Sequence, residues 1–507
     1  MNEELGKAYQ VGELPALDLG GILVDNQLLP DAPVNLVLKS FNRHGLIAGA
    51  TGSGKTKTMQ VLCEQLSLAG VPSLVMDIKG DVSGLAMAGV ESDFIRKRCQ
   101  QLDLSFNPRG FPVEILTLNE EQQGVPLRAT VADFGPILFS RMLDINETQA
   151  GVVTVIFQFA KEEQLPLIDL ADFKALLQYV QSDAGKAEME ARFGAVASSS
   201  IGIITRKIIE LESQGGNSFF AEPAFNVMDL MRTNNQGLGI ISILRLMDMQ
   251  DKPKLFSTFM LKLLSDVYRV MPELGDPDKP KLVLFIDEAH LVFNNASKAL
   301  LNLLDTIVKL IRSKGIGLIF STQTPNDIPD SILSQLGLKV QHALRAFTAK
   351  DRQAMKLVAQ NFPPSTYYNT EQLLTSLGIG EALLSALDGK GQPTPLIQCM
   401  VRAPESRMGA LTEQELSQVV SQSTLVMQYR RKVNTRSAAD ILAERKEQAA
   451  VMDEKNHSGK TAKKIPEEPS IIDQISKNTL FRQLVRQFFR QMTQQLLKIL
   501  GMNKKSR

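Results

Sequence analysis

The sequence is poor in the features that mark secreted and membrane proteins. It has only three cysteines in 507 residues, and Cys63, Cys99 and Cys399 are scattered, which excludes a disulfide framework and a cysteine-based metal site. The first nine residues carry Glu3 and Glu4 and no apolar core, so no signal peptide is expected. No uncharged apolar run is long enough to span a bilayer. These absences together indicate a cytoplasmic protein.

The sequence also lacks an excess of charge of either sign. Its net charge is +1, so nothing draws the whole chain toward nucleic acid or membrane, and any such surface has to be local. Apolar residues make up 44% and charged residues 22%, as in ordinary globular proteins. A chain of this length holds about two to four domains and an ample core.

What the sequence does have is a complete phosphate-binding loop. Residues 49–56 read G-x-x-x-x-G-K-T between an apolar strand, Leu46–Ala48, and a helically spaced apolar segment that ends at Gly70. The glycines let backbone amides face phosphate oxygens, Lys55 reaches the β- and γ-phosphates, and the Thr56 hydroxyl binds Mg²⁺. The alternative, a chance glycine-rich turn, does not account for the strand and helix on either side. The expected ATP-binding residues are Gly49, Ala50, Thr51, Gly52, Ser53, Gly54, Lys55 and Thr56.

A second motif supplies the acids that phosphate chemistry requires. The apolar run Leu282–Ile286 leads directly into Asp287 and Glu288, the pattern of a Walker B strand. We expect Asp287 to hold Mg²⁺ through water and Glu288 to polarise the attacking water. The alternative is a buried strand that merely ends in acids. A glutamate beside the Walker B aspartate favours an additional-strand ATPase that activates water over a small-molecule kinase.

Two further strand ends carry polar residues. The strand ending at Asp77 leads into Asp77-Ile78-Lys79-Gly80-Asp81, which is either part of a ligand site or a plain acidic turn. The strand 316–321 leads to Gln323, our candidate sensor of the γ-phosphate, although a capping amide in a turn is the alternative.

The chain divides into six segments by pattern. The expected fold is α/β, a RecA-like P-loop ATPase core of the additional-strand, catalytic-glutamate type, with a mainly helical insertion and a basic amphipathic C-terminal tail. Further strands are expected at 72–77, 111–118, 238–244, 338–347, 381–387 and 395–401. The segments are a β-rich entry at 1–40, the first part of the core at 41–118, the insertion at 119–230, the second part of the core at 231–402, a charged helix and flexible linker at 403–470, and the tail at 471–507.

The tail repeats apolar residues every four positions and carries basic residues on another face. Its Leu480, Leu484 and Phe488 exemplify the apolar stripe, and Arg482 and Arg486 the basic face. A segment of this kind contacts DNA phosphates or an anionic membrane surface, or docks as a helix on the protein's own subunits, which we favour.

Several motifs taken together resemble one superfamily. They are Asn42–Thr56, Asp77–Asp81, Gln214–Gly216, Asp287–Leu291, Ile311–Gly315 and Ser321–Pro325. The set is similar to the HerA/FtsK superfamily, and within it to the stand-alone bacterial HerA-like (YjgR-like) ATPases, over about residues 20–402. DEAH-box helicases share the phosphate loop and Asp-Glu-Ala-His, but 232 residues (287 − 55) separate Lys55 from Asp287 here, and no second RecA-like domain follows.

This resemblance implies more than the residues alone. It implies a homo-oligomeric ring, a hexamer in the family, with ATP bound between subunits and Mg²⁺ as the metal. By position Arg312, and secondly Arg43, look similar to the family's catalytic arginines, which stabilise charge in the transition state. An ordinary surface ion pair is the alternative for either side chain.

Two functions remain open from the sequence. The first is a Mg²⁺-dependent ATP hydrolase that drives a ring-forming translocase or helicase-like motor on double-stranded DNA, which rests on the family alone. The second is an ATPase without a DNA substrate that acts as a conformational or assembly switch, its tail contacting a protein or membrane surface.

Overall fold

The computed structural model describes residues 2–249, 251–346 and 348–458. Residues 1–443 form one compact unit, and residues 444–507 a second unit, of which only the end of one helix, to Ser458, lies within the described residues. The predicted tail at 471–507 and the end of the predicted linker lie outside the described residues. No described helix is both long enough and apolar enough to cross a bilayer.

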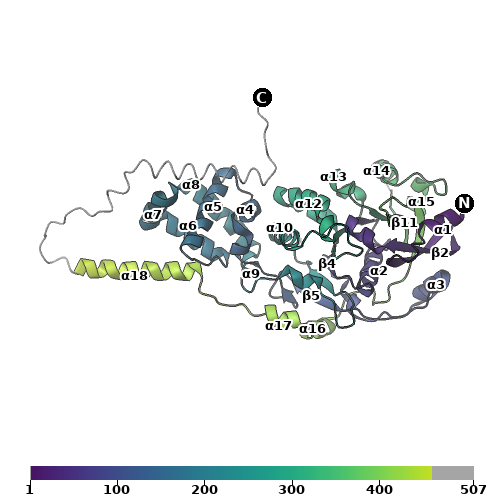
Figure 1. The fold of residues 1–507 in the computed structure, drawn as a ribbon, viewed down its shortest axis with the longest axis horizontal. Helices are drawn as coiled ribbons and strands as arrows, with labels where there is room; N and C mark the ends of the chain where they lie inside the picture. Colours follow the sequence, from purple (N-terminus) through teal and green to yellow (C-terminus); the bar gives the residue numbers. More distant parts are fainter. Residues whose placement is uncertain (1, 250, 347, 459–507) are drawn as a thin grey trace, which may run out of the picture. The chain divides into compact units, whose positions relative to one another are not determined.

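A single twelve-stranded sheet organises the first unit (Figure 1). Across the sheet the strands are β2 (Gln27–Val37), β1 (Ala16–Val24), β12 (Ile397–Val401), β11 (Glu381–Ser385), β10 (Leu338–His342), β3 (Gly45–Ala48), β9 (Ile316–Thr322), β8 (Leu282–Ile286), β4 (Ser73–Asp77), β7 (Ile241–Arg245), β5 (Val113–Thr117) and β6 (Val125–Pro126). The eight strands from β10 to β6 run parallel, whereas β11, β12, β1 and β2 continue the sheet as an antiparallel arm.

Successive residues of the central strands are buried on opposite faces of this sheet. In β8, Leu284 joins the core cluster on one face and Phe285 the cluster on the other, and both side chains are fully buried. Covering both faces of a parallel sheet produces the continuous apolar runs seen in the sequence, because neither face meets water. This confirms the predicted α/β class, and β9 lies between the phosphate-loop strand β3 and the Walker B strand β8, as an additional-strand core requires.

Helices cover the two faces. They are α1 (Asn2–Ala8), α2 (Lys55–Leu68), α3 (Asp93–Leu102), α10 (Pro253–Val270), α11 (Ala289–Asn295), α12 (Lys298–Leu310), α13 (Asp330–Leu333), α14 (Ala349–Gln360) and α15 (Thr370–Ser376). The phosphate-loop helix α2 buries Met59, Leu62 and Leu66 in one cluster, while α10 and α12 contribute to the other. Gly70, in the left-handed conformation at φ 71°, ends α2 near the position where the pattern predicts its end.

The predicted insertion contains a helical bundle. Its helices are α4 (Val131–Met142), α5 (Glu147–Glu162), α6 (Leu170–Gln181), α7 (Asp183–Phe193), α8 (Ser198–Ser213) and α9 (Gly216–Phe219). Helix α5 begins where the sequence suggests, because Asn146 and Gln149 exchange side-chain to backbone hydrogen bonds in a capping box. The segment 119–230 also includes β6, which pairs with β5 and extends the sheet, so its first residues belong to the core.

Two outcomes differ from the sequence pattern. Strand β10 ends at His342 instead of 347, because the next carbonyl, that of Ala343, leaves the sheet and accepts a hydrogen bond from the Ala50 amide of the phosphate loop. The compact unit also continues past residue 402 to Ala443, with α16 (Glu413–Ser421), α17 (Thr424–Tyr429) and the start of α18 (Ala438–Ser458). Buried Leu416 and Tyr429 attach these short helices to the core.

Candidate active site

The phosphate loop leaves β3 at Ala48 and enters α2 at Lys55, with tight packing on both sides. Gly49 has φ 152°, and a Cβ there would lie 2.6 Å from the Cβ of His342. Gly54 has φ 116°, and a Cβ there would lie 3.1 Å from the Gly380 amide nitrogen. Only glycine fits such contacts at these backbone angles, so the loop holds its amides and the N-terminus of α2 toward one point.

Lys55 lies folded over this loop. Its ammonium is buried and donates to the carbonyl oxygens of Gly49 at 2.6 Å and Ala50 at 3.2 Å. Burial lowers the pKa of Lys55, the neighbouring Lys79 lowers it further, and the carboxylates of Glu288 and Asp287 oppose that shift. The coupling among these charges indicates that the loop and the Walker B acids face the same space.

Asp287 leaves one carboxylate oxygen free for a ligand. Its Oδ1 accepts a hydrogen bond of 2.8 Å from the Ser321 hydroxyl on the neighbouring strand β9. Its Oδ2 is buried without a hydrogen-bond partner among the described residues, and burial raises the pKa of the group. A buried carboxylate oxygen without a partner is costly unless a cation satisfies it, so Asp287 fits the expected Mg²⁺.

Glu288 lies beside a lysine and a histidine. Lys79 forms an ion pair with one carboxylate oxygen, and Nδ1 of His290 lies 3.1 Å from the other. Burial would raise the pKa of Glu288, but hydrogen bonding and charge from Lys79, with smaller contributions from His290 and Lys55, bring it below its ordinary value. Glu288 also has φ 45°, an uncommon backbone angle for a side chain of this kind. The carboxylate is therefore ionised, buried and fixed in position.

The turn after β4 explains how Lys79 reaches Glu288. The two carboxylate oxygens of Asp77 accept hydrogen bonds from the backbone amides of Gly80 at 2.7 Å and Val82 at 3.3 Å. Burial raises the pKa of Asp77 to about 6. Asp77 thus shapes an acidic turn, and the turn carries Lys79 to the site. We did not expect a role for Lys79 from the sequence, although the adjacency of β4 and β8 is the signal that could have revealed it.

Gln323 follows β9 at the same edge of the sheet. Its side chain is exposed and makes no hydrogen bond with the described part of the chain. The preceding carbonyl, that of Thr322, accepts a hydrogen bond of 3.2 Å from the Gly49 amide, so the strand end is tied to the phosphate loop. A sensing role for Gln323 stays a prediction.

Arg43 and Arg312 lie together, but not beside the phosphate loop of their own chain. Arg43 ends the short 3₁₀ helix Leu38–Arg43 before β3, and Arg312 belongs to the 3₁₀ turn Ile311–Lys314 before β9. The carboxylate of Asp276 lies 3.8 Å from Arg43 and 3.3 Å from Arg312. Both arginines are therefore at the amino edge of the parallel sheet, whereas the loop is at its carboxyl edge, a β3 length of about 13 Å away at 3.3 Å per residue.

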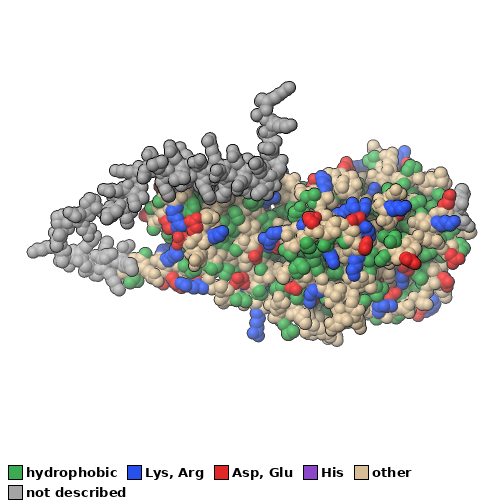
Figure 2. Space-filling model, viewed as in Figure 1, with side chains coloured by type: hydrophobic (Ala, Val, Ile, Leu, Met, Phe, Trp, Pro, Cys, Tyr) green, Lys and Arg blue, Asp and Glu red, His purple; other side chains and the backbone are tan. Residues whose placement is uncertain are grey.

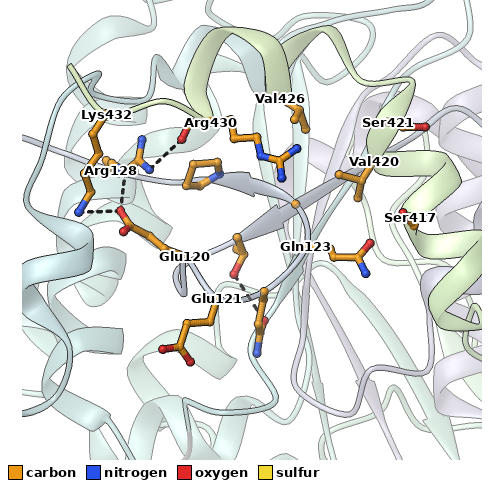
Figure 3. A pocket seen from close by; sticks show the side chains of 14 residues that line it. Glu120, Glu121, Gln123, Arg128, Ser417, Val420, Ser421, Val426, Arg430 and Lys432 are labelled. Carbon is orange, nitrogen blue, oxygen red and sulfur yellow. Dashed lines mark hydrogen bonds and ion pairs between the residues drawn. The ribbon is translucent and has the colours of Figure 1, made fainter.

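A separate polar groove, of about 470 Å³, lies at the far end of the sheet (Figure 3). It is formed by the loop between β5 and β6 together with α16 and α17, and in it Arg128 and Lys432 both pair with Glu120. No phosphate-loop or Walker B residue lines this groove. The phosphate loop and the Walker B acids lie apart from it, at the carboxyl edge of β3, β9 and β8.

Known proteins are similar to this chain in sequence and in fold. A family model described as "Helicase HerA-like C-terminal" matches residues 24–505. The DNA double-strand break repair helicase HerA of Saccharolobus solfataricus is 22% identical over 374 residues, which cover 72% of this chain and 66% of that protein.

Solved structures agree in fold. The unbound bacterial conjugative coupling protein TrwBΔN70 superposes with a TM-score of 0.51 at 15% identity, covering 81% of this chain and 94% of that one. The plasmid coupling protein TrwB in complex with ADP and Mg²⁺ gives 0.50 at 16% identity, covering 80% and 92%. Together with the family match over nearly the whole chain, these findings place the protein: it belongs to the helicase HerA-like C-terminal family and is a P-loop ATPase of the HerA/FtsK type.

Proposed function

We propose that the protein is a Mg²⁺-dependent ATP hydrolase that works in the cytoplasm as a homo-oligomeric ring and moves double-stranded DNA. The observation that supports hydrolysis most directly is the buried pair Asp287–Glu288, which follows β8 and is separated from the phosphate-loop strand β3 by the single strand β9. A TrwB structure in complex with ADP and Mg²⁺ supports the choice of nucleotide and metal.

Each residue has a defined task in this proposal. The amides of residues 49–56 and the Lys55 ammonium bind the β- and γ-phosphates, and Lys55 leaves its two loop carbonyls to do so. Thr56 and Asp287 would hold Mg²⁺, which neutralises charge on the phosphates when bound. Glu288 orients and polarises the attacking water, and Gln323 reports on the γ-phosphate from the adjacent strand end.

The positions of Arg43 and Arg312 support the proposal of a ring. Neither Arg43 nor Arg312 can reach the phosphate loop of its own subunit, because they lie at the opposite edge of the sheet. In a head-to-tail ring whose interface joins the amino edge of one subunit to the carboxyl edge of the next, Arg312 would complete the neighbour's site. We propose Arg312 as the first candidate and Arg43 as the second.

A Glu288→Gln variant tests the hydrolytic assignment. Glutamine keeps the size of the side chain but cannot accept a proton, so turnover should fall about a hundredfold or more while ATP binding persists. Steady-state phosphate release and equilibrium binding of a non-hydrolysable ATP analogue measure the two quantities. Unchanged turnover would remove Glu288 from the mechanism.

Duplex DNA tests the motor assignment. Addition of double-stranded DNA at low salt should stimulate turnover, and rising salt should suppress the stimulation, because phosphate contacts depend on counterion release. On the face shown in Figure 2, Lys and Arg side chains are interspersed with Asp and Glu, so a DNA-binding surface would have to form elsewhere or on assembly. Absence of stimulation at low salt would favour the switch without a DNA substrate.

A further inference from the structure

A short loop before β11 lies directly against the phosphate loop. It comprises residues 377–380, and its Gly380 amide donates a hydrogen bond of 3.0 Å to the Ser53 carbonyl. On the same side, a Cβ added to Gly54 would lie 3.1 Å from the Gly380 nitrogen and 3.2 Å from its Cα. The two loops are thus in van der Waals contact, and neither can shift without the other.

A buried arginine fixes this loop. Arg98, on α3, is 7% exposed, and its guanidinium donates to the carbonyl oxygens of Ile379 at 2.9 Å, Gly380 at 3.1 Å and Val401 at 2.9 Å. Its guanidinium also lies 5.3 Å from the centre of the Phe94 ring. Burial lowers the pKa of Arg98, so placing this cation here costs free energy, which the three carbonyl contacts offset. A chain segment held in this way is a rigid platform.

The tip of the platform is apolar and uncovered. Ile379 stands between two glycines, and 67% of it is exposed although the backbone around it is firmly held. Exposed isoleucines are ordinary when they are isolated on a surface. This one is different because its own carbonyl is anchored by Arg98 and its neighbour contacts the loop that binds phosphate.

The direction of a bound nucleotide follows from the order of the strands. The γ-phosphate must lie toward β8, because Asp287 and Glu288 are there, and the polyphosphate therefore extends over the loop away from β8. On that other side of β3 the sheet continues with β10 and β11, and residues 377–380 lead into β11. The nucleoside end of ATP is thus directed toward the platform.

We propose that Ile379 is a base-contacting residue, whose side chain packs against the face of the purine ring of ATP. The inference rests on the proposed ATP site and adds the subsite that binds the base. An aromatic base gains most from a flat apolar contact that is fixed before binding, because little side-chain or loop entropy is then lost.

The test separates the base from the phosphates. An Ile379→Ala variant should bind a non-hydrolysable ATP analogue about tenfold more weakly, whereas its affinity for inorganic tripolyphosphate, which has no base, should equal that of the wild type. Titration calorimetry of the full chain measures both. Ile379→Val should stay close to wild type because most of the apolar contact remains. Ile209→Ala, at a 52% exposed position on α8, is the matched control and should change neither affinity.

Each other result contradicts the inference. If Ile379→Ala weakened both ligands equally, the loop would serve only to support the phosphate loop. If it changed neither, the base would bind elsewhere. A wild-type chain that binds tripolyphosphate but gains nothing from the nucleoside would overturn the base subsite and leave the phosphate site standing, whereas a chain that binds neither ligand would overturn the proposed function itself.

Discussion

Charged side chains at the two edges of the parallel sheet differ in burial and in pairing. At the carboxyl edge, Lys55, Asp287 and Glu288 are all less than 6% exposed, and one oxygen of Asp287 has no partner in the described chain. At the amino edge, Arg43 and Arg312 are partly exposed and meet Asp276, a carboxylate with a 39% exposed side chain. Buried charges without complete pairing are typical of a ligand-binding site, because a bound ligand supplies the missing partner. Exposed and paired charges are typical of a surface that can contact another subunit. In the proposed ring, the sheet would therefore separate two halves of one catalytic apparatus.

The largest effect is expected when Arg312 is replaced. If its charge acts across a subunit boundary, Arg312→Ala should lower turnover about a thousandfold without loss of ATP binding. Arg269→Ala, an exposed arginine on α10 that pairs with Asp266, serves as the control and should keep full turnover.

Mixing subunits sharpens the same test. Arg312→Ala and Glu288→Gln chains, each inactive alone, should recover turnover when assembled together, because some interfaces then join an intact arginine to an intact glutamate. Phosphate release from mixed and unmixed samples measures the effect. No recovery in mixed rings would place Arg312 outside the shared site.

Low pH should reduce the stability of the fold through two buried histidines, one near each edge of the sheet. Burial lowers the pKa of His44, at the amino edge, and of His342, behind the phosphate loop, to about 4 in each case. At these two side chains the unfolded chain therefore binds more protons than the folded one between about pH 6.5 and 4, so their contribution to stability falls as the pH falls through that window. Each histidine should cost about 2 kcal/mol between about pH 7.5 and 5.

A His44→Asn variant isolates one of these contributions. His44 Nδ1 accepts from the Leu318 amide at 3.0 Å, a bond that the asparagine oxygen can replace, and asparagine tolerates the φ of 59°. Chemical unfolding at about pH 7.5 and 5 should show a smaller acid loss in the variant than in the wild type. Asp77, with its raised pKa, acts in the opposite direction but is common to both chains and cancels. Equal losses would exclude His44.

Removal of Lys79 should have a smaller effect, confined to the carboxyl edge. In Lys79→Met the Glu288 carboxylate loses the ammonium that fixes it and that lowers its pKa against the effect of burial, so turnover should fall about tenfold with ATP affinity nearly unchanged. Lys79→Arg should restore part of the rate. Lys309→Met, at an exposed i,i+4 pair with Asp305, is the matched control. A change in affinity without a change in turnover would mean that Lys79 binds phosphate instead.

The smallest effect is expected at Asp276. Its carboxylate also lies 3.1 Å from Lys39, and exposed pairs of this kind contribute about 0–1 kcal/mol. Asp276→Asn should therefore leave thermal stability nearly unchanged and alter turnover by no more than about twofold. A loss as large as that of Arg312→Ala would show that Asp276 aims the arginines and is not a passive partner.

Local patterns predicted the parts of the site that are built within one strand–turn–helix unit. The phosphate loop and the Walker B acids are of this kind, because the glycines and the apolar run that precede the functional groups are contiguous in sequence. The α/β class and the place of most strands followed from the same periodicities, and the fold and the family comparison confirm the RecA-like core.

The remainder depends on contacts between distant segments. The pairing of Lys79 with Glu288 exists because β4 and β8 are neighbours, and the anchoring of Ile379 exists because α3 packs near β12. Neither adjacency is encoded in a local pattern. The sequence pattern does not predict the short helices α16 and α17 for a related reason. Each has only a few buried residues, such as Tyr429, and these are recognisable as buried only from the core that they cover.

The pairing of β1 with β12 has a consequence for biosynthesis. Gly20 of β1 lies opposite Val401 of β12. One edge of β1 therefore cannot form its hydrogen bonds until β12, about 380 residues later in the chain, has been synthesised. Until the ribosome has delivered β12, the hairpin of β1 and β2 cannot join the sheet, and an isolated hairpin is marginal in water. A nascent chain stalled before residue 397 would therefore expose that hairpin to chaperones and proteases. Release of β12 from the ribosome would be the step that completes the antiparallel arm of the sheet.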